Sequence, residues 1–182
     1  MKLISMLVLL CLIGGMHITS VAQDNSEVKS KSEKSKKLKK KKLEELKEYK
    51  KKCLAEIKKH KGYTVILYEL CNWTGETITA VKVMNGKIVS RKVYDGESEY
   101  KNKTPSVTED QNNINKSEEG ERARTMEQLI TESESIIKNW DDYTYDLTVD
   151  IDGFELTCTI YPRGWLDVKS TGVTIEKIIW HD

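Results

Sequence analysis

Aspartates crowd the stretch 141–152, where residue types and spacing come closest to a reactive or ion-binding site. The carboxylates are those of Asp141, Asp142, Asp146, Asp150 and Asp152. Clustered carboxylates are the ligands that Ca²⁺ prefers, and Asp150-x-Asp152-Gly153 matches part of an EF-hand loop. That loop needs Asp at its first position and Glu at its last, where this chain has Thr148 and Thr159. Asp146, Asp150 and Asp152 are therefore candidate metal ligands in an incomplete motif, and no cofactor is predicted.

A strand explains the same aspartates without a metal. Between positions 143 and 151 aromatic and aliphatic residues alternate with polar ones, so the aspartates fall on the solvent face of a strand. Any two of these acids could instead form the carboxylate pair of a hydrolase. The stretch 141–152 thus leaves a solvated strand face and an unrecognised hydrolytic site as alternatives.

Cysteine and histidine offer little further chemistry. No Cys-x-x-Cys or His-x-x-x-His spacing predicts zinc, and no Gly-x-Ser-x-Gly, phosphate-loop or dinucleotide fingerprint occurs. A cysteine nucleophile with a histidine base would have to combine Cys53, Cys71 or Cys158 with His60 or His181, and no motif supports such a pair beyond the presence of these residues in one chain. Cys71 and Cys158 fall in predicted strands and form the candidate disulfide, which would leave Cys53 free or linking two chains. The alternative is that all three are small buried thiols.

The first 22 residues have the pattern of a secretory signal peptide. Lys2 provides a positive start, Leu3–Gly15 is a short hydrophobic run, and Ser20-Val21-Ala22 places small residues at a cleavage site. A retained membrane anchor is the alternative, although the run is shorter than the roughly 20 residues that a spanning helix needs. We therefore expect a secreted, periplasmic or extracellular protein, cleaved near Ala22.

The charges divide into two blocks of opposite sign. Residues 23–61 contain 16 basic and 7 acidic side chains, whereas residues 62–182 contain 13 and 22. Such asymmetry indicates interaction surfaces. The candidate anion-binding residues are Lys36, Lys37, Lys39, Lys40, Lys41 and Lys42. Their partners would be acidic lipid headgroups or anionic polymers, with no specific nucleic acid expected; the alternatives are a solvated tether and an arm that lies on the acidic domain.

The basic block begins as low-complexity sequence and continues as a helix. Residues 23–37 are mostly Ser, Lys and Glu, which predicts disorder. From Leu38 to His60 hydrophobic residues recur every three or four positions, which predicts an amphipathic helix of coiled-coil type. A homodimer through this helix or through Cys53 is one possible partner arrangement, and another protein is a second.

Residues 62–182 predict an α+β domain. Period-two hydrophobic patterns indicate strands near 63–71, 77–84, 87–94, 143–151, 154–160 and 173–180. A helix with a Thr125/Gln128 capping box is predicted at about 125–139. We expect an antiparallel sheet of about five to six strands with this one helix packed on one face. The polar stretch 97–121 predicts a mobile loop, and Trp73 and Trp165 fall in turns, where they are candidate binding residues.

This order of motifs resembles a family of small exported domains of unknown function, mostly from bacteria. The resemblance covers about residues 50–180. The motifs that carry it are Gly62-Tyr63-Thr64, Cys71, the Asn85-Gly86 hairpin, Thr125–Leu129, Tyr145-Asp146 and Asp152-Gly153-Phe154. The chain departs from the family at Glu155, where a proline is usual. The resemblance implies the fold and export but no activity.

We therefore expect an exported, non-enzymatic binding domain of unknown ligand, with its basic arm as a tether or anionic-surface anchor. The alternative is a secreted hydrolase with a carboxylate-based site near residues 141–152, which would require a pocket containing clustered ionisable groups.

Overall fold

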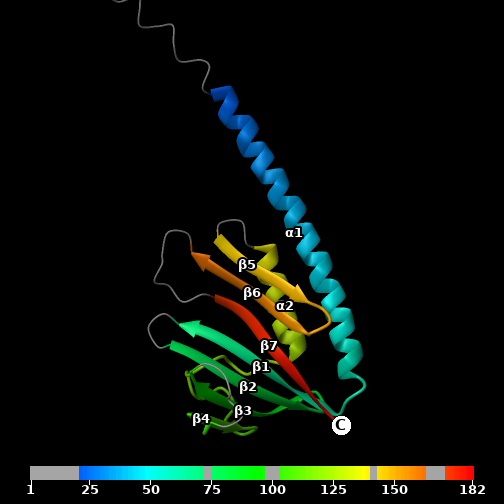
Figure 1. Ribbon diagram of the computed structural model, residues 1–182, viewed down its shortest axis with the longest axis vertical. Coiled ribbons are helices and arrows are strands. Elements are labelled where there is room, and N and C mark those ends of the chain that lie inside the picture. Colours follow the sequence, from blue (N-terminus) through cyan, green and yellow to red (C-terminus); the bar gives the residue numbers. More distant parts are fainter. Residues whose placement is uncertain (1–20, 72–74, 97–102, 140–142, 163–170) are drawn as a thin grey trace, which may run out of the picture. The chain divides into compact units, whose positions relative to one another are not determined.

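The computed structural model describes residues 21–71, 75–96, 103–139, 143–162 and 171–182 (Figure 1). The chain divides into two compact units, Met1–Leu38 and Lys39–Asp182. The elements are α1 (Val21–Ile57), β1 (Gly62–Cys71), β2 (Gly75–Met84), β3 (Lys87–Asp95), β4 (Val107–Asp110), α2 (Met126–Lys138), β5 (Tyr143–Asp150), β6 (Glu155–Pro162) and β7 (Thr171–His181). The described part of the first unit, residues 21–38, is helical.

The strands form one antiparallel sheet in the order β4-β3-β2-β1-β7-β6-β5. The predicted α+β class with an antiparallel sheet is confirmed, but the sheet has seven strands rather than five to six. Six of them match the predicted strands. The Asn85-Gly86 hairpin forms with φ of 50° and 74°, the positive values that its tight turn requires. β4 is the additional strand, and it comes from the stretch predicted to be a loop.

The main hydrophobic core lies on one face of the sheet. Tyr63, Val65 and Leu67 alternate along β1 and point into it, as alternate residues of a strand must. α2 covers this face with a stripe that includes Leu129 and Ile130. The predicted capping box forms: Thr125 Oγ1 accepts a bond from the Gln128 amide, and the Gln128 side chain accepts one from the Thr125 amide.

α1 contributes a second packed helix, where only one was expected. Leu46, Tyr49 and Cys53 of α1 belong to the same core as α2. The Tyr49 hydroxyl donates to the Phe154 carbonyl at 3.1 Å, and Lys52 Nζ lies 3.0 Å from Asp152 Oδ1. These contacts tie the second half of α1 to the β5–β6 turn.

The same helix also begins earlier than expected. α1 starts at Val21, so residues 23–37, for which the composition predicted disorder, are helical. The composition was misleading because this stretch has no Gly or Pro and leads into a packed helix. Extending an existing helix is much less unfavourable than nucleating one.

A buried ion pair organises the stretch predicted to be a mobile loop. Arg91 on β3 is 1% exposed, and its Nη1 lies 2.9 Å from Oε2 of Glu109, which is 3% exposed. Arg91 also donates to the carbonyls of Glu121 and Glu119. The described part of the predicted loop, residues 103–121, is therefore built around a charged anchor on β3. Sequence patterns could not identify that anchor, because an arginine in a strand is usually exposed.

Glu109 completes the network from the other side. It accepts hydrogen bonds from the amides of Asn115 and Ser117 at 2.8 and 2.7 Å. Burial disfavours its charged form, but the two amides and the Arg91 guanidinium outweigh that effect and hold the pKa of Glu109 below its usual value. Ile114 and Ala123 then pack against the main core. The segment between β4 and α2 thus contributes to the same core as the helices.

Candidate functional site

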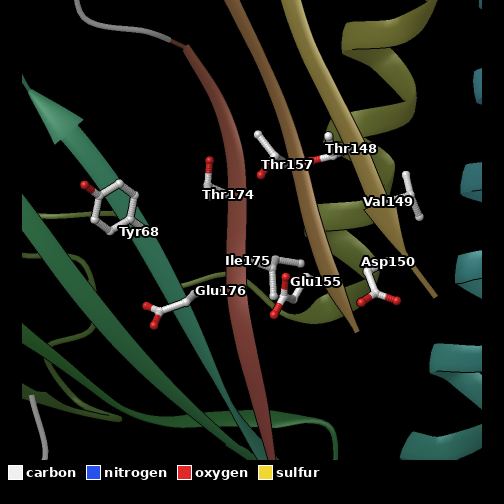
Figure 2. A pocket seen from close by; sticks show the side chains of 9 residues that line it. All are labelled: Tyr68, Thr148, Val149, Asp150, Glu155, Thr157, Thr174, Ile175 and Glu176. Atoms are coloured by element: carbon white, nitrogen blue, oxygen red, sulfur yellow. The ribbon is translucent and has the colours of Figure 1, made fainter. Parts of the chain in front are cut away.

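The face of the sheet opposite the helices carries a shallow groove of about 350 Å³ (Figure 2). Four adjacent strands form it: β1, β7, β6 and β5. The lining residues are Tyr68, Thr148, Val149, Asp150, Glu155, Thr157, Thr174, Ile175 and Glu176. Most of them alternate with core residues such as Leu67, Leu156 and Val173, which places their side chains on the open face.

The strand register arranges these side chains in two rows across the sheet. Thr148 pairs with Thr157, and Thr157 pairs with Thr174, which gives a row of three hydroxyls. Two residues further along the strands, Asp150 pairs with Glu155. Leu156 pairs with Ile175 in the antiparallel β6–β7 pair, so the preceding residue, Glu155, lies beside the following one, Glu176. The second row therefore presents three carboxylates from three neighbouring strands.

Like charges side by side are unfavourable in a sheet. Within the described residues no basic side chain forms an ion pair with Glu155 or Glu176. Lys177 follows Glu176 but does not line the groove. Carboxylates directly opposite each other typically destabilise a sheet by a few tenths to about 1 kcal/mol. The row is thus a feature that stability alone does not favour.

Asp150 is held in its ionised form. Its Oδ1 accepts hydrogen bonds from the amides of Gly153 and Asp152, at 3.0 and 2.9 Å. These bonds, that from Gly153 first, lower the pKa of Asp150. Asp150 can therefore accept hydrogen bonds and attract a cation, but it cannot act as a general acid near neutral pH.

Tyr68 closes the groove on the β1 side. Its half-buried ring packs against a small second hydrophobic cluster formed by Ile66, Ile78 and Tyr94 on the same face. The groove therefore offers one tyrosine ring, three threonine hydroxyls and three carboxylates on four adjacent strands. Such a set can bind a positively charged group that donates several hydrogen bonds.

Of the three predicted metal ligands, the structure describes the side chains of Asp150 and Asp152. The Asp150 carboxylate is used in its own turn, and that of Asp152 pairs with Lys52. Asp146 lies on β5, but its side chain is outside the described residues, as are Asp141 and Asp142. Among the side chains that the structure describes, no group of three potential ligands could hold a metal ion.

The predicted Cys71–Cys158 disulfide is wrong. Cys71 lies on β1 and Cys158 on β6, with β7 between them. Residues two strands apart have Cα atoms roughly 10 Å apart, beyond the roughly 7 Å that a disulfide tolerates. Cys158 is a free, buried thiol that donates to the Ser133 carbonyl at 3.6 Å.

Cys53 is also free and fully buried, so a disulfide through it would require α1 to leave the core. Burial raises the pKa of the thiols of Cys53 and Cys158 to about 12. Neither is therefore a thiolate near neutral pH, and neither fits the role of a nucleophile.

The predicted basic residues all lie on α1, where successive residues point in different directions. Lys36 and Lys37 are exposed, as are Lys40 and Lys41. Lys39 is partly exposed, and Lys42 pairs with Glu45 at 2.8 Å. The run thus surrounds the helix rather than forming one face. The other predicted contact residues, Trp73 and Trp165, lie outside the described residues.

His60 follows the end of α1, and His181 is the last residue of β7. His60 Nδ1 is 2.6 Å from Asp182 Oδ1, and its Nε2 is 3.4 Å from Glu56 Oε1. Its ring stacks on Trp180 with centroids 5.3 Å apart. His181 is partly buried, and its Nε2 lies 2.8 Å from Thr64 Oγ1. His60 therefore links α1 to β7 through charge and stacking.

This arrangement predicts a pH dependence of stability. The hydrogen bond to Asp182, then that to Glu56, raises the pKa of His60 against a smaller opposing effect of desolvation. A raised folded-state pKa means that the charged form is favoured by folding. Its stabilisation is complete below the unfolded pKa of about 6.5 and is lost as pH rises through the folded value.

We therefore expect the free energy of unfolding, measured by urea titration between pH 5.5 and 8.5, to fall more steeply with pH in the natural protein than in His60→Gln. Trp180 provides a local fluorescence signal for the same titration. Parallel stability curves for the two proteins would contradict the prediction.

The sequence missed Tyr68, Glu155 and Glu176 as site residues. The register that pairs Asp150 with Glu155 follows from the Asp152-Gly153 turn, so this pair was within reach. Glu176 was not, because the chain does not reveal that β7 lies beside β6.

Comparisons with known proteins add no relative. The chain matches no protein-family model, no curated protein and no solved structure. The resemblance to exported domains of unknown function therefore stays a prediction. None of the helices in the described part of the chain is both long and hydrophobic enough to cross a membrane.

Proposed function

We propose that this protein is a non-catalytic binding domain that holds a cationic ligand on its open sheet face. The observation that supports this most is the row formed by Asp150, Glu155 and Glu176 in a groove beside an aromatic ring. A row of like charges is unfavourable until something positive binds to it. An amine or guanidinium group bound there would relieve the repulsion.

The shape and composition of the groove favour binding by several weak contacts. Its residues lie on four hydrogen-bonded strands, so little ordering is needed when a ligand binds. The threonine hydroxyls can donate or accept, and the Tyr68 ring can lie against aliphatic or cationic parts of a ligand. We therefore expect ligands with two or more positive charges to bind more tightly than those with one.

The ionised state of Asp150 and the burial of two cysteines count against the hydrolase alternative. Asp150 remains ionised, and Cys53 and Cys158 are buried, neutral thiols on the other face. A carboxylate hydrolase needs a group that can donate a proton at its working pH. Of the two functions considered from the sequence, binding is the one that the groove supports.

Export and anchoring complete the proposal. The signal-like residues 1–22 favour export, and the lysines of α1 favour attachment to an anionic surface through screened, long-range attraction. Deletion of residues 24–38 leaves the unit Lys39–Asp182 intact and removes Lys36 and Lys37 but keeps the other four candidate lysines, so it tests anchoring by the arm that precedes this unit. Loss of salt-sensitive binding to anionic vesicles would support it, and unchanged binding would contradict it.

The binding proposal is tested with spermidine as a trivalent probe and butylamine as a monovalent one. We expect spermidine to bind in calorimetric titrations at low salt, with affinity falling as salt rises. Glu155→Gln/Glu176→Gln should weaken that binding by about tenfold or more, which corresponds to about 1.4 kcal/mol. Butylamine should bind far more weakly to every variant.

The matched control removes two exposed acids elsewhere, Glu118→Gln/Glu119→Gln, with the same change in net charge. It should leave spermidine affinity within twofold of the natural protein. If the control lost as much spermidine affinity as Glu155→Gln/Glu176→Gln, binding would depend on the net charge of the protein and not on the groove, which would overturn the proposal. Absence of spermidine binding to the natural protein would also overturn the proposal.

A further inference from the structure

A second groove lies on the helix side of the sheet, between the second half of α1 and α2. It has a volume of about 520 Å³, which is within the usual range for small-molecule sites. Its lining residues are Lys40, Leu43, Glu44, Leu46, Lys47, Lys50, Ile130 and Glu134. None of them lines the groove on the open sheet face, so the two sites are independent.

The floor of this groove is hydrophobic. Leu46 and Ile130 are buried members of the main core, and Leu43 is partly exposed where it packs against them. Leu43 and Leu46 stand three positions apart on α1, so their side chains share one face of the helix. A ligand that covers this floor would remove the remaining hydrophobic surface from water, at roughly 25 cal/mol per Å².

The rim of the groove is basic. Lys40, Lys47 and Lys50 follow the same side of α1 as the floor, since positions seven apart return to nearly the same direction. Of the two acids, Glu134 forms an ion pair at 2.6 Å with Lys138, which lies outside the groove; this pair, together with Lys50, lowers the pKa of Glu134. The lining thus carries three ammonium groups and two carboxylates, one of which already has a basic partner outside the groove.

We infer that this groove binds a single-chain anionic amphiphile, that is, an alkyl chain ending in a carboxylate, sulfate or phosphate. The chain would cover Leu43 and the edges of Leu46 and Ile130, while the head would lie among the lysines. Lysine side chains suit this role, because their aliphatic stems lie along hydrophobic surface while the ammonium group stays in water. This binding is separate from the cation binding proposed for the open face.

Decanoate, used below the concentration at which it forms micelles, is the probe. We expect it to bind the natural protein in calorimetric titration, and decyltrimethylammonium, with the same chain and the opposite charge, to bind at least tenfold more weakly. Lys47→Gln/Lys50→Gln should weaken decanoate binding by about tenfold. Leu43→Ser should weaken it to a similar extent by removing part of the floor.

Two exposed lysines outside the groove, Lys51 and Lys58, provide the matched control. Lys51→Gln/Lys58→Gln should bind decanoate as the natural protein does, and thermal melts should confirm that every variant is folded. Equal weakening by this control would show diffuse attraction to the basic helix and overturn the inference. Equal binding of the two decyl probes, unchanged binding in Leu43→Ser, or no decanoate binding to the natural protein would also overturn it.

Discussion

Arg91→Ala is expected to lower the free energy of unfolding by about 3–5 kcal/mol, the usual consequence of removing one partner of a buried ion pair. Without the guanidinium, the buried Glu109 carboxylate keeps only two amide partners, and the carbonyls of Glu119 and Glu121 lose their donors. The segment between β4 and α2 would then lose its attachment to β3. Urea unfolding followed by circular dichroism measures the change.

Lys92→Ala is the matched control, because Lys92 is the exposed neighbour of Arg91 on the same strand. Its effect should stay within about 0.5 kcal/mol. Similar small losses in both variants would contradict the structural role given to Arg91.

Gly120→Ala is expected to cost about 2–4 kcal/mol. Gly120 has φ of 65°, a conformation that costs a residue with a Cβ about 1 kcal/mol or more. An added Cβ would also lie 2.6 Å from Thr79 Oγ1 and 2.7 Å from Val93 Cγ1, so the segment would have to move away from the sheet. Forcing extra volume into a packed site typically costs about 1–3 kcal/mol.

Gly86→Ala separates the cost of the positive φ from the cost of the steric clash. Gly86 has a similar φ of 74°, but no atom lies within 4 Å of the added Cβ. We expect it to lose only the conformational part, about 1 kcal/mol. Equal losses for the two variants in urea titrations would show that the close approach of Gly120 to the sheet is unimportant.

Arg91→Ala and Gly120→Ala both act on a part of the fold that the sequence did not predict, the segment between β4 and α2. Local patterns identified six strands and α2 with its cap, because alternation, Asn-Gly and capping signals act over a few residues. The segment between β4 and α2 is held instead by Arg91, which is 18 residues from Glu109 and 30 from Glu121 along the chain. Its polar composition therefore gave no indication of order.

Local patterns were limited in the same way for the helix α1. Its amphipathic pattern predicted a helix, but not the attachment of that helix to the β5–β6 turn through Tyr49 and Lys52. The disulfide error has a related cause. Cys71 and Cys158 both lie on predicted strands, and only the strand order shows that β7 separates them.

The open-face groove was only partly accessible from the sequence. The stretch 141–152 drew attention to Asp150, and the turn that follows it fixes its pairing with Glu155. Tyr68 and Glu176 come from β1 and β7, which reach the groove only through the sheet order. A search for catalytic spacing along the chain could not find a site whose residues are neighbours only across strands.

Repulsion within the row of carboxylates lowers the stability of the fold, and this loss can be related to function. Sites that bind charged ligands often carry local repulsion, which substitution relieves while binding is lost. Substitutions that stabilise the fold and weaken cation binding together would be typical of such a site.

The most direct measurement of the central claim is a spermidine titration followed by NMR of the threonine methyl groups. The proposal predicts that the methyls of Thr148, Thr157 and Thr174 shift together with one dissociation constant. The methyl resonance of Thr131, which is exposed on α2, should not shift. Shifts confined to other threonines, or no shift at saturating spermidine, would contradict a cation-binding groove on the open face.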